Sequence, residues 1–548
     1  MIRTLRYRLL LAFLAVRRFR RRTFRLAPAR LWLFAVLIAA AAAFAVIGFR
    51  IAIDAVSVIA FGGTEEMVAS AAASLNFFRA WAAPIIGGLA VSGLMYLTGR
   101  YNWLPEGRTQ GVAEVIEARA IRDGRVSFRA GLSSAAISAV SLGSGASAGR
   151  EGPAVHIGAT IASILDRWFG FSAKDRRTLL GCGAAAAVSA SFNAPVAGVI
   201  FALEVILGNY ALSVFGPIAA ASVTAAIVTK LTLGDFPAFA APAYGAATAL
   251  DVPLSALLGV ICGLVATVFL LCTEQLTERV RNFASERNIS YIFLPPIAGL
   301  LVGLIGAWHP EIFGVGYEAV TRALQGEYSL RILFTLAVLK ITATAITVSC
   351  RFGGGVFSPG LVIGVFAGAA FGAAVSEALP DHAAGATYYA MVGMGAASGA
   401  IIGAPISTTL IVFELTGDYT MTMSLMVAVA LATLITQSLA GKSFFHWQLS
   451  RRGYDLSEGP QGVILKTIRV RDVMDRMPQN APLDKDAARL EAQQSLGEAI
   501  ALLERESEDG LPVVDPGSPE KVIGYLSRVK ALAAYNRALI DSHIEHHI

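Results

Sequence analysis

One carboxylate, that of Glu151, lies within a long apolar segment of the sequence, where charged residues are rare. Glu151 and its neighbour Arg150 are the only charged residues in the segment 131–165. An ionisable group inside a membrane segment is costly and is functional by default. Such a carboxylate can compete with an anion for a binding site and withdraw when it takes up a proton. Glu151 is therefore predicted to gate an anion path, and the alternative is an ion pair with Arg150 that holds the loop.

The motif around Glu151 occurs twice in the chain. GREGPAVHIG covers residues 149–158 and GVFSPGLVIG covers residues 355–364, and both follow the pattern Gly, three residues, Pro, four residues, Gly. Further along each half, an Ala-Pro pair is followed by a glutamate nine residues after the proline, at Glu204 and at Glu414. Segments interrupted by Gly and Pro at corresponding places in two halves indicate a transporter site at the interface of the repeats.

The two prolines of the repeated motif, Pro153 and Pro359, are predicted to lie in the first turn of a helix, where proline is favoured. A helix start presents unpaired N–H groups and a partial positive charge. Two such starts, one from each half, could converge on an anion. Partial charges suit a conducted ion, because passage requires binding that is weak enough to release it.

The composition predicts that these residues lie in a membrane domain. Of the 548 residues, 55% are hydrophobic and only 15% are charged, against about 25% charged in soluble domains. A cytosolic enzyme is therefore excluded for most of the chain. Residues 211–228 and 254–271 are uninterrupted spans that match a bilayer core of about 30 Å. Four segments are broken by Gly and Pro, which is tolerated only in buried or cavity-lining helices: 131–165, 181–207, 352–375 and 392–413.

The N-terminus is strongly basic. Ten arginines fall within residues 1–30, and the first acidic residue is Asp54. A basic segment directly before an apolar span predicts a cytoplasmic N-terminus. A nucleic-acid-binding arm is the weaker alternative, and a cleavable signal peptide is disfavoured because many apolar spans follow.

The cysteines suggest neither a metal site nor a redox pair. Their spacing is wide, and each is predicted to be a small buried apolar residue: Cys182, Cys262, Cys272 and Cys350. No metal or other cofactor is expected in the membrane region.

The composition becomes soluble in character from about residue 451. This tail is long enough for one small α/β module. We expect a strand near 463–470, a helix over 496–506, a strand over 510–514, a turn at 515–518, a strand over 522–526 and a final helix from Val529.

Together, GREGP, GVFSP and the repeated Ala-Pro followed by Glu resemble the CLC family of chloride channels and chloride/proton antiporters, over about residues 31–449. The resemblance implies an α-helical polytopic membrane protein built from two inverted repeats of tilted and broken helices, at about 80–240 and 290–440. It implies three parts, namely a basic cytoplasmic N-terminus at 1–30, the transport domain at 31–450 and a cytoplasmic module at 451–548. It further implies a homodimer in a bacterial inner membrane, with an anion pathway in each subunit.

The tail carries its own resemblance. VRDVM at 470–474, GLPVVD at 510–515 and VIGYLSRVKAL at 522–532 resemble a cystathionine-β-synthase (CBS) type regulatory module. Such a module could bind a nucleotide.

The CLC resemblance also assigns roles to residues. It makes Glu151 the external gate and the backbone amides of Val356 and Phe357 chloride ligands. With the residues around them, the candidate anion-binding set is Gln110, Gly149, Arg150, Gly152, Gly355, Val356, Phe357, Ser358 and Phe445.

Three positions depart from the family pattern. TQGVA at 109–113 aligns with the family's GSGIP, so that Gln110 replaces a serine. Phe445 aligns with a tyrosine and has no hydroxyl. Val205 stands where antiporters often have a second glutamate that receives cytoplasmic protons.

These departures bear on proton coupling. Glu151 and Glu204 are the candidate proton-pathway residues, although the symmetric placement of Glu204 and Glu414 favours a structural role. Without a relay at Val205, we expect channel-like or weakly coupled chloride transport rather than tight exchange with protons.

Two other classes of protein were weighed. An intramembrane serine protease would use Ser144 or Ser147 with His156 as base, but it leaves the second-half repeat unexplained. A nucleotide sensor with a membrane anchor leaves the elaborate membrane domain unexplained. The sequence thus predicts a transport protein that is not an enzyme, with a monovalent anion as substrate, protons as a candidate second substrate, and no nucleic-acid partner.

Overall fold

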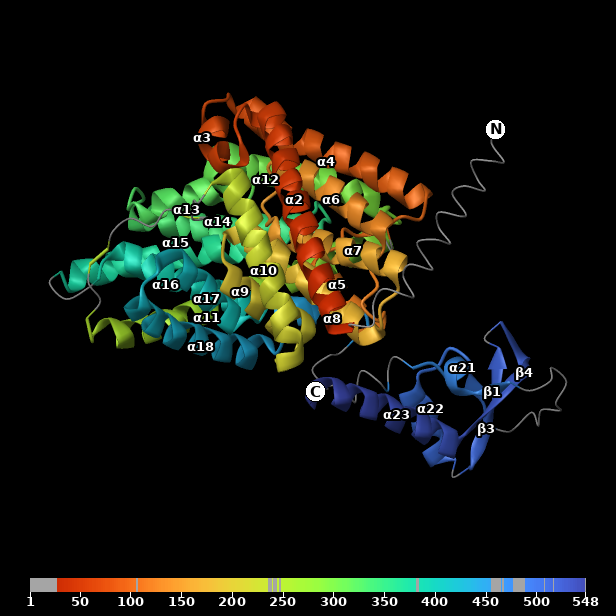
Figure 1. Ribbon diagram of the computed structural model, residues 1–548. Helices are drawn as coiled ribbons and strands as arrows, with labels where there is room; N and C mark the ends of the chain where they lie inside the picture. The colour runs from red at the N-terminus through yellow and green to blue at the C-terminus, as the bar shows by residue number, and fades with distance from the viewer. Residues whose placement is uncertain are drawn as a thin grey trace, which may run out of the picture. The chain divides into compact units, whose positions relative to one another are not determined.

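A computed structural model describes residues 27–104, 107–234, 239, 244–245, 248–380, 384–454, 465, 468–476, 488–506, 508–515 and 517–547. The chain forms two compact units (Figure 1). The first comprises Met1–Gly208 and Val214–Phe444, and the second comprises Asn209–Ser213 and Phe445–Ile548.

Helices build the whole membrane region. The first half of the chain contains α2 (Ala27–Phe61), η1 (Glu65–Met67), α3 (Val68–Ala73), α4 (Phe77–Arg100), α5 (Val112–Ile121), α6 (Phe128–Gly143), α7 (Glu151–Phe169), α8 (Ala173–Phe192), α9 (Pro195–Phe201), the π-helical turn η3 (Ala202–Leu207) and α10 (Leu212–Leu233).

The second half repeats this composition of long and short helices. It contains α11 (Asp251–Glu286), η4 (Tyr291–Phe293), α12 (Leu294–Trp308), η5 (Pro310–Ile312), α13 (Tyr317–Leu324), α14 (Leu330–Ser349), α15 (Phe357–Ala378), α16 (Ala386–Ile402), α17 (Pro405–Thr416), α18 (Tyr419–Ala440) and α19 (Phe444–Ser450). Within the described residues, eight helices are long and apolar enough to cross a membrane. The chain is an integral membrane protein with several spans.

The predicted spans and breaks agree with these bounds. The uninterrupted spans at 211–228 and 254–271 lie in α10 and α11. Each of the four segments predicted to be broken holds a helix start in its interior, at α7, α9, α15 and α17. Proline lies in the first turn of all four helices, as its fixed φ and missing N–H favour. Their prolines are Pro153, Pro195, Pro359 and Pro405.

Glycine lets corresponding helix pairs approach closely in the two halves. A Cβ atom at Gly158 of α7 would lie 2.1 Å from the carbonyl oxygen of Gly183 in α8. In the same way, a Cβ atom at Gly364 of α15 would lie 2.2 Å from the carbonyl oxygen of Gly393 in α16. Small residues at helix crossings are typical of membrane proteins. Glycines at corresponding positions therefore allow α7 to pack closely on α8 and α15 to pack closely on α16.

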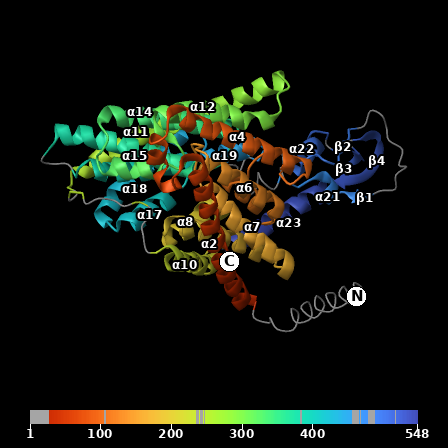
Figure 2. The ribbon, with the colours of Figure 1, turned by 90° about the horizontal axis from the view of Figure 1, so that it is seen from above.

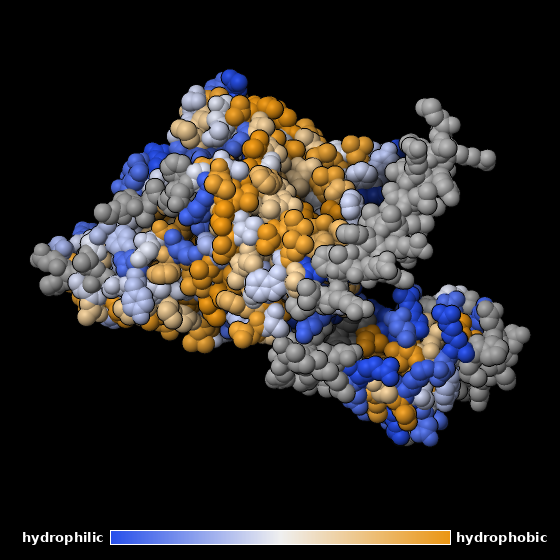
Figure 3. All heavy atoms as spheres, in the orientation of Figure 1, coloured by the Kyte–Doolittle hydropathy of each residue, from blue (hydrophilic) through white to orange (hydrophobic). Residues whose placement is uncertain are grey.

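The surface of the first unit is apolar where helices face outward. In Figure 1 the long helix α2 runs beside α10, and Trp32 of α2 lies against Gly216 of α10. Hydrophobic residues form a continuous area over these two helices (Figure 3). Seen from above, the helices spread over a broad area with α7 and α8 beside α2 (Figure 2). This surface is what a bilayer requires of a spanning protein.

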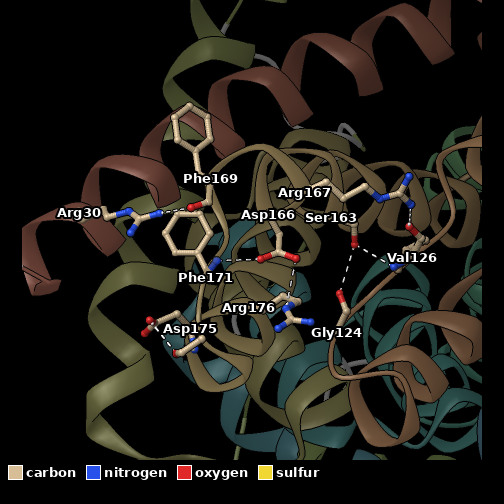
Figure 4. Close-up of polar contacts among 11 residues, drawn as sticks. Arg30, Gly124, Val126, Ser163, Asp166, Arg167, Phe169, Phe171, Asp175 and Arg176 are labelled. Carbon is tan, nitrogen blue, oxygen red and sulfur yellow. Dashed lines mark hydrogen bonds and ion pairs between the residues drawn. The ribbon is translucent and has the colours of Figure 1, made fainter. Parts of the chain in front are cut away.

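Polar contacts fix the C-terminal end of α7, the end opposite Glu151 (Figure 4). Asp166 pairs with Arg176 of α8 at 3.3 Å and also accepts a hydrogen bond from the Phe171 N–H. Ser163 bonds the loop between α5 and α6, because its hydroxyl donates to the Gly124 carbonyl and accepts from the Val126 N–H. These contacts anchor α7 and so help to fix where its first turn lies.

The structure corrects one prediction about the cysteines. Cys182, Cys262 and Cys350 are buried, whereas Cys272 is exposed on α11. That helix has a face turned away from the protein, and an apolar surrounding outside the protein suits a cysteine as well as the interior does.

The tail folds around a four-stranded sheet with the order β1-β4-β3-β2. The strands are β1 (Asp475–Arg476), β2 (Leu490–Glu491), β3 (Gly510–Asp515) and β4 (Ser518–Ser527). β2 and β3 are parallel, and the other pairs are antiparallel. The helices are α21 (Val470–Val473), α22 (Leu496–Arg505) and α23 (Arg528–His547), and apolar residues of α22, β3 and β4 form the core.

The predictions for the tail are right for its longer elements and wrong for the shorter ones. The helix from Leu496, the hairpin of β3 and β4, and the final helix agree with the structure. The predicted strand at 463–470 is wrong in the part that the structure describes, because Val470 begins α21. A short apolar run does not distinguish a strand from a helical turn. The two-residue strands β1 and β2 were not predicted.

Candidate functional site

The two copies of the repeated motif meet at their first glycines. Gly149 and Gly355 exchange two backbone hydrogen bonds, with an N···O distance of 2.7 Å in each direction. A Cβ atom at Gly355 would lie 3.3 Å from the N atom of Gly152, so the residues that follow Gly149 also lie against Gly355. This bridge brings the starts of α7 and α15 together across 206 positions of sequence.

Both helix starts lack a cap. The N-cap residues of α7 and α15 are Arg150 and Val356, and within the described part of the chain neither N-cap side chain bonds the N–H groups of its helix. Both starts are buried, and the hydroxyl of Ser358 in the first turn of α15 has no hydrogen-bond partner among the residues that the structure describes. The first N–H groups of a helix need partners from a side chain, water or a ligand. Two buried and uncapped starts therefore form a suitable place for an anion.

The carboxylate of Glu151 lies at this place. A Cβ atom at Gly149 would be 2.7 Å from Glu151 Oε2 and 3.0 Å from the N atom of Ser358. The carboxylate oxygen and the amide of α15 thus border the same small space. Glu151 is buried, and no described residue forms a hydrogen bond with its Oε2, whereas its Oε1 accepts a hydrogen bond of 3.3 Å from the Tyr317 hydroxyl.

The ion pair of Arg150 is made with Glu65 and not with Glu151. Arg150 Nη1 lies 2.7 Å from Glu65 Oε2, and both side chains are buried. The guanidinium carbon of Arg150 also lies 4.6 Å from the ring centroid of Tyr317. The alternative in which Arg150 and Glu151 pair to hold the loop is therefore not the arrangement found. The Glu151 carboxylate lies next to the helix starts instead.

A cavity of about 430 Å³ lies beside Arg150 and Tyr317. Its walls are formed by Arg50, Glu66, Arg150, Ala190, Ser191, Phe192, Asn193, Thr229, Leu233, Gly234, Tyr317 and Thr321. Phe192 packs on Phe357, the first residue of α15, with ring centroids 5.3 Å apart. Arg150 and Tyr317, which flank Glu151, thus also face a space large enough for several water molecules.

The predicted residue Gln110 lies beside the start of a third helix. Gln110 precedes Gly111, the N-cap of α5, and a Cβ atom at Gly111 would lie 4.0 Å from the carbonyl carbon of Gly152. The Gln110 amide nitrogen donates to the Arg108 carbonyl at 3.1 Å. Unlike α7 and α15, α5 has a charged cap, because the Gly111 N–H donates to Glu114 Oε2 at 2.5 Å. This start therefore already has an anionic partner.

The symmetric glutamates cap short helices. Glu204 accepts hydrogen bonds from the Ile406 N–H at 3.0 Å and from the Ser407 N–H at 2.8 Å, at the start of α17. Glu414 accepts from the Val196 N–H at 2.9 Å and from the Ala197 N–H at 2.8 Å, at the start of α9. These contacts are what a structural role requires.

The local geometry of Glu204 differs from the expected α-helix. Glu204 and Val205 lie in the π-helical turn η3. A rotation of about 100° between neighbouring residues holds for an α-helix, and it is smaller in a π-helix because each turn holds more residues. The direction of Glu204 follows from its bonds to α17 rather than from that angle.

Phe445 is buried and is the first residue of the second unit's longer segment. The helix starts belong to the first unit and Phe445 belongs to the second. The serines of the protease alternative do not contact His156. Ser144 donates to the Ser141 carbonyl, and Ser147 bonds Thr344.

Two site residues were missed by sequence reasoning, Glu65 and Tyr317. Glu65 lies in the short turn η1 and Tyr317 begins α13, both outside the repeated motif, and each contacts the motif only through the fold. The only signal for Glu65 was an acidic pair at 65–66 directly after the first span.

The family follows from comparison with known proteins. Residues 87–437 match the model of the voltage gated chloride channel family, which is more than half of the chain. The chain belongs to this CLC family. It is accordingly an anion-transport protein of the membrane and not an enzyme, and the protease alternative is wrong. The match to the family does not extend into the tail.

Relatives named as chloride channels and relatives named as H⁺/Cl⁻ exchange transporters both resemble the chain. A ClcB-like protein of Ralstonia nicotianae, which carries the name of a chloride channel, is 31% identical over 423 residues, covering 76% of this chain and 96% of that protein. The H⁺/Cl⁻ exchange transporter ClcA of Salmonella arizonae is 29% identical over 374 residues, covering 66% of this chain and 78% of that protein.

Solved structures share the fold of the CLC family. A slow cyanobacterial Cl⁻/H⁺ antiporter superposes with a TM-score of 0.68 at 20% identity, over 77% of this chain and 98% of that chain. A eukaryotic CLC transporter superposes with a TM-score of 0.65 at 16% identity, over 92% and 98%. At these identities the likeness concerns the fold alone. The predicted helical polytopic CLC fold is thus confirmed, and the small α/β sheet of the tail accompanies it.

Proposed function

We propose that the chain moves chloride, or a similar monovalent anion, along a pathway within each subunit that Glu151 gates. The observation that carries this proposal is the position of Glu151 Oε2, which borders the same space as the Ser358 N–H between two uncapped helix starts. A carboxylate in that space excludes an anion while it is ionised. Protonation removes its charge and its competition for the N–H groups.

The ligands of the anion are backbone groups for the most part. The proposed set from the two motifs is Gly149, Arg150, Gly152, Gly355, Val356, Phe357 and Ser358. Helix-start N–H groups and the Ser358 hydroxyl replace part of the hydration of the ion, and they do so with partial charges. Pairing with Glu65 supports this assignment, because it leaves Arg150 without a full free charge that would hold the anion too tightly.

Gln110 and Phe445 complete the proposed set of anion-binding residues. Gln110 has one N–H engaged by the Arg108 carbonyl and a second N–H that can donate to an anion. Phe445 lacks a donor, so the constriction there is apolar. Both assignments rest on the alignment with the CLC motifs.

Channel-like or weakly coupled transport is favoured over tight exchange with protons. Val205 cannot relay a proton, and the Glu204 carboxylate is engaged by the start of α17. The alternative is a tightly coupled chloride/proton antiporter. The Salmonella relative carries the name of an H⁺/Cl⁻ exchange transporter. In that case Glu204 or ordered water would carry protons to Glu151.

We further propose a homodimer in a bacterial inner membrane with both termini in the cytoplasm. Glu204 and Glu414 are only half-buried in a membrane helix pair, and exposing carboxylates to lipid is costly. A second copy covering α9 and α17 would shield them. The tail is proposed to be a CBS-type regulatory module that could bind a nucleotide, supported by its motifs and its mixed sheet.

The reversal potential of the chloride current in liposomes with an imposed pH gradient tests the mechanism. Uncoupled transport predicts a reversal potential set by the chloride gradient alone. A reversal potential that shifts with the proton gradient at a fixed ratio would support the antiporter and contradict the channel-like account. The absence of any chloride movement would contradict both.

A further inference from the structure

The hydroxyl of Tyr317 is the hydrogen-bond donor to the gate. Tyr317 is the first residue of α13, 166 positions from Glu151 in sequence, and its hydroxyl lies 3.3 Å from Glu151 Oε1. Both side chains are buried, with exposed fractions of 6% and 3%. Tyr317 also lines the cavity of about 430 Å³, together with Arg150. Tyr317 therefore contacts both the gate carboxylate and the wall of this cavity.

The ring of Tyr317 is fixed from two sides. The guanidinium of Arg150 lies 4.6 Å from its centroid, and the ring of Phe239 lies 4.7 Å from it. Arg150 is in turn held by Glu65 at 2.7 Å, and the Glu65 N–H donates to Asp54 at 2.9 Å. A ring packed in this way keeps its hydroxyl in one direction, so the bond to Glu151 costs little rotational freedom.

The backbone before Tyr317 is fixed as well. Lys340 of α14 is fully buried, and its Nζ donates to the carbonyl oxygens of Ile312 and Gly314 at 3.1 and 3.0 Å. Gly316 then has a φ of +94°, which an L side chain rarely adopts. This loop sets where α13 begins, and with it the position of Tyr317.

We propose that Tyr317 is a positioning residue for the gate: its hydroxyl holds the ionised Glu151 carboxylate between the two helix starts, and the Glu65–Arg150 pair holds Tyr317 in place. This inference rests on the proposed gating role of Glu151. A donor that bonds the ionised form favours that form. Removing the donor therefore makes protonation of the gate easier and opens the pathway at a higher external pH.

Other charged groups face this cluster and set the background. They are Arg50 and Asp54 of α2, Glu65 and Glu66 of η1, Arg150 at the N-cap of α7, and Lys340 of α14. The charged residues that follow Tyr317 on α13 have other partners, because Glu318 accepts from the Ser70 N–H and Arg322 pairs with Glu327. Substituting tyrosine by phenylalanine changes none of their charges, so a shift in the pH dependence then reports the lost hydroxyl.

The test compares Tyr317→Phe with wild type and with Tyr328→Phe, using chloride efflux from proteoliposomes as a function of external pH. Tyr328 is the matched control, because its hydroxyl is buried without a hydrogen-bond partner and lies outside the gate. We expect the midpoint of Tyr317→Phe to move up by about one pH unit, the size expected for a hydrogen bond to a charged group. The control should keep the wild-type midpoint. An unchanged or lowered midpoint in Tyr317→Phe would overturn the proposal.

A second variant tests the support of the ring. Glu65→Gln should shift the midpoint in the same direction by a smaller amount, because Arg150 loses its charged partner. Glu117→Gln is its control, since Glu117 is also a buried carboxylate paired with an arginine, Arg122, but on α5. Equal midpoints for the two variants would contradict the role given to Glu65.

A third variant separates the two proposals. If Glu151→Ala abolishes the external pH dependence and Tyr317→Phe leaves the midpoint unchanged, only the role of Tyr317 is wrong. If Glu151→Ala itself retains the wild-type pH dependence, the gating role is wrong. The double variant Tyr317→Phe, Glu151→Ala should behave like Glu151→Ala, because Tyr317 acts through Glu151.

Discussion

Glu204 and Glu414 cap each other's helices. The carboxylate of Glu204 binds the first N–H groups of α17, which carries Glu414, and the carboxylate of Glu414 binds those of α9, which leads into Glu204. The two residues occupy corresponding places in the repeat. Reciprocal capping therefore joins the two halves of the chain through two charged contacts at helix starts, where negative charge is stabilising.

Glu204→Ala and Glu414→Ala should each lower the thermal stability of the protein. Loss of a charged cap removes about 1–2 kcal/mol, and the effects of the two variants should be similar. Unfolding followed in detergent measures this, with Glu377→Ala on the exposed side of α15 as the control. A Glu204→Ala variant of unchanged stability but altered proton coupling would make Glu204 a proton site instead.

Gly149→Ala should reduce chloride flux at least ten-fold while the protein stays folded. The new Cβ atom would lie 2.7 Å from Glu151 Oε2 and 3.0 Å from the N atom of Ser358, in the space assigned to the anion. Overpacking of this size costs about 1–3 kcal/mol. Gly93→Ala is the control, because nothing lies within 4 Å of its Cβ position. Wild-type flux in Gly149→Ala would mean that the anion passes elsewhere.

Gln110→Ser should change selectivity without abolishing transport. A shorter hydroxyl donor would replace the amide beside the start of α5, and the cap of that helix by Glu114 would remain. The relative permeation of chloride, bromide and nitrate measures the effect. Identical selectivity in the variant and in wild type would show that Gln110 does not contact the ion.

The helix α22 of the tail should become less stable in acid. The hydrogen bond from the Ser495 N–H to the Glu498 carboxylate, and then the Ser495 side chain, hold the pKa of that carboxyl below its ordinary value. A lowered pKa stabilises the folded state above the ordinary pKa, and this contribution is lost as pH falls through the folded value. Amide exchange of α22 in the full protein should be faster in Glu498→Gln than in wild type at pH 7, and equal in both well below pH 4. A difference that persists in acid would contradict this.

The sequence predicted the helix starts well because their signals are local. Proline and glycine act within one turn of the residues that they affect, so the breaks before Glu151 and Phe357 could be placed from spacing alone. The apolar spans followed from length for the same reason. Short strands such as β1 have two residues and no periodicity, which left nothing to detect.

The partners of the gate could not be predicted in the same way. Glu65 reaches Arg150 across 85 positions, and Tyr317 reaches Glu151 across 166 positions. Such contacts depend on how helices pack and not on any pattern in the neighbouring sequence. The only partner that the sequence offered for Arg150 was its chain neighbour Glu151, as the alternative to a gating role, and adjacent residues at a helix start do not face each other.

The most direct test of the account is the external pH dependence of chloride efflux in Glu151→Ala. The variant lacks the carboxylate that borders the Ser358 N–H, so the pathway should stay open. We expect efflux at neutral and alkaline external pH at least as fast as that of wild type at acidic pH, with no dependence on external pH between about 4 and 8. Efflux from Glu151→Ala that still falls as external pH rises, with the wild-type midpoint, would contradict the assignment of Glu151 as the gate.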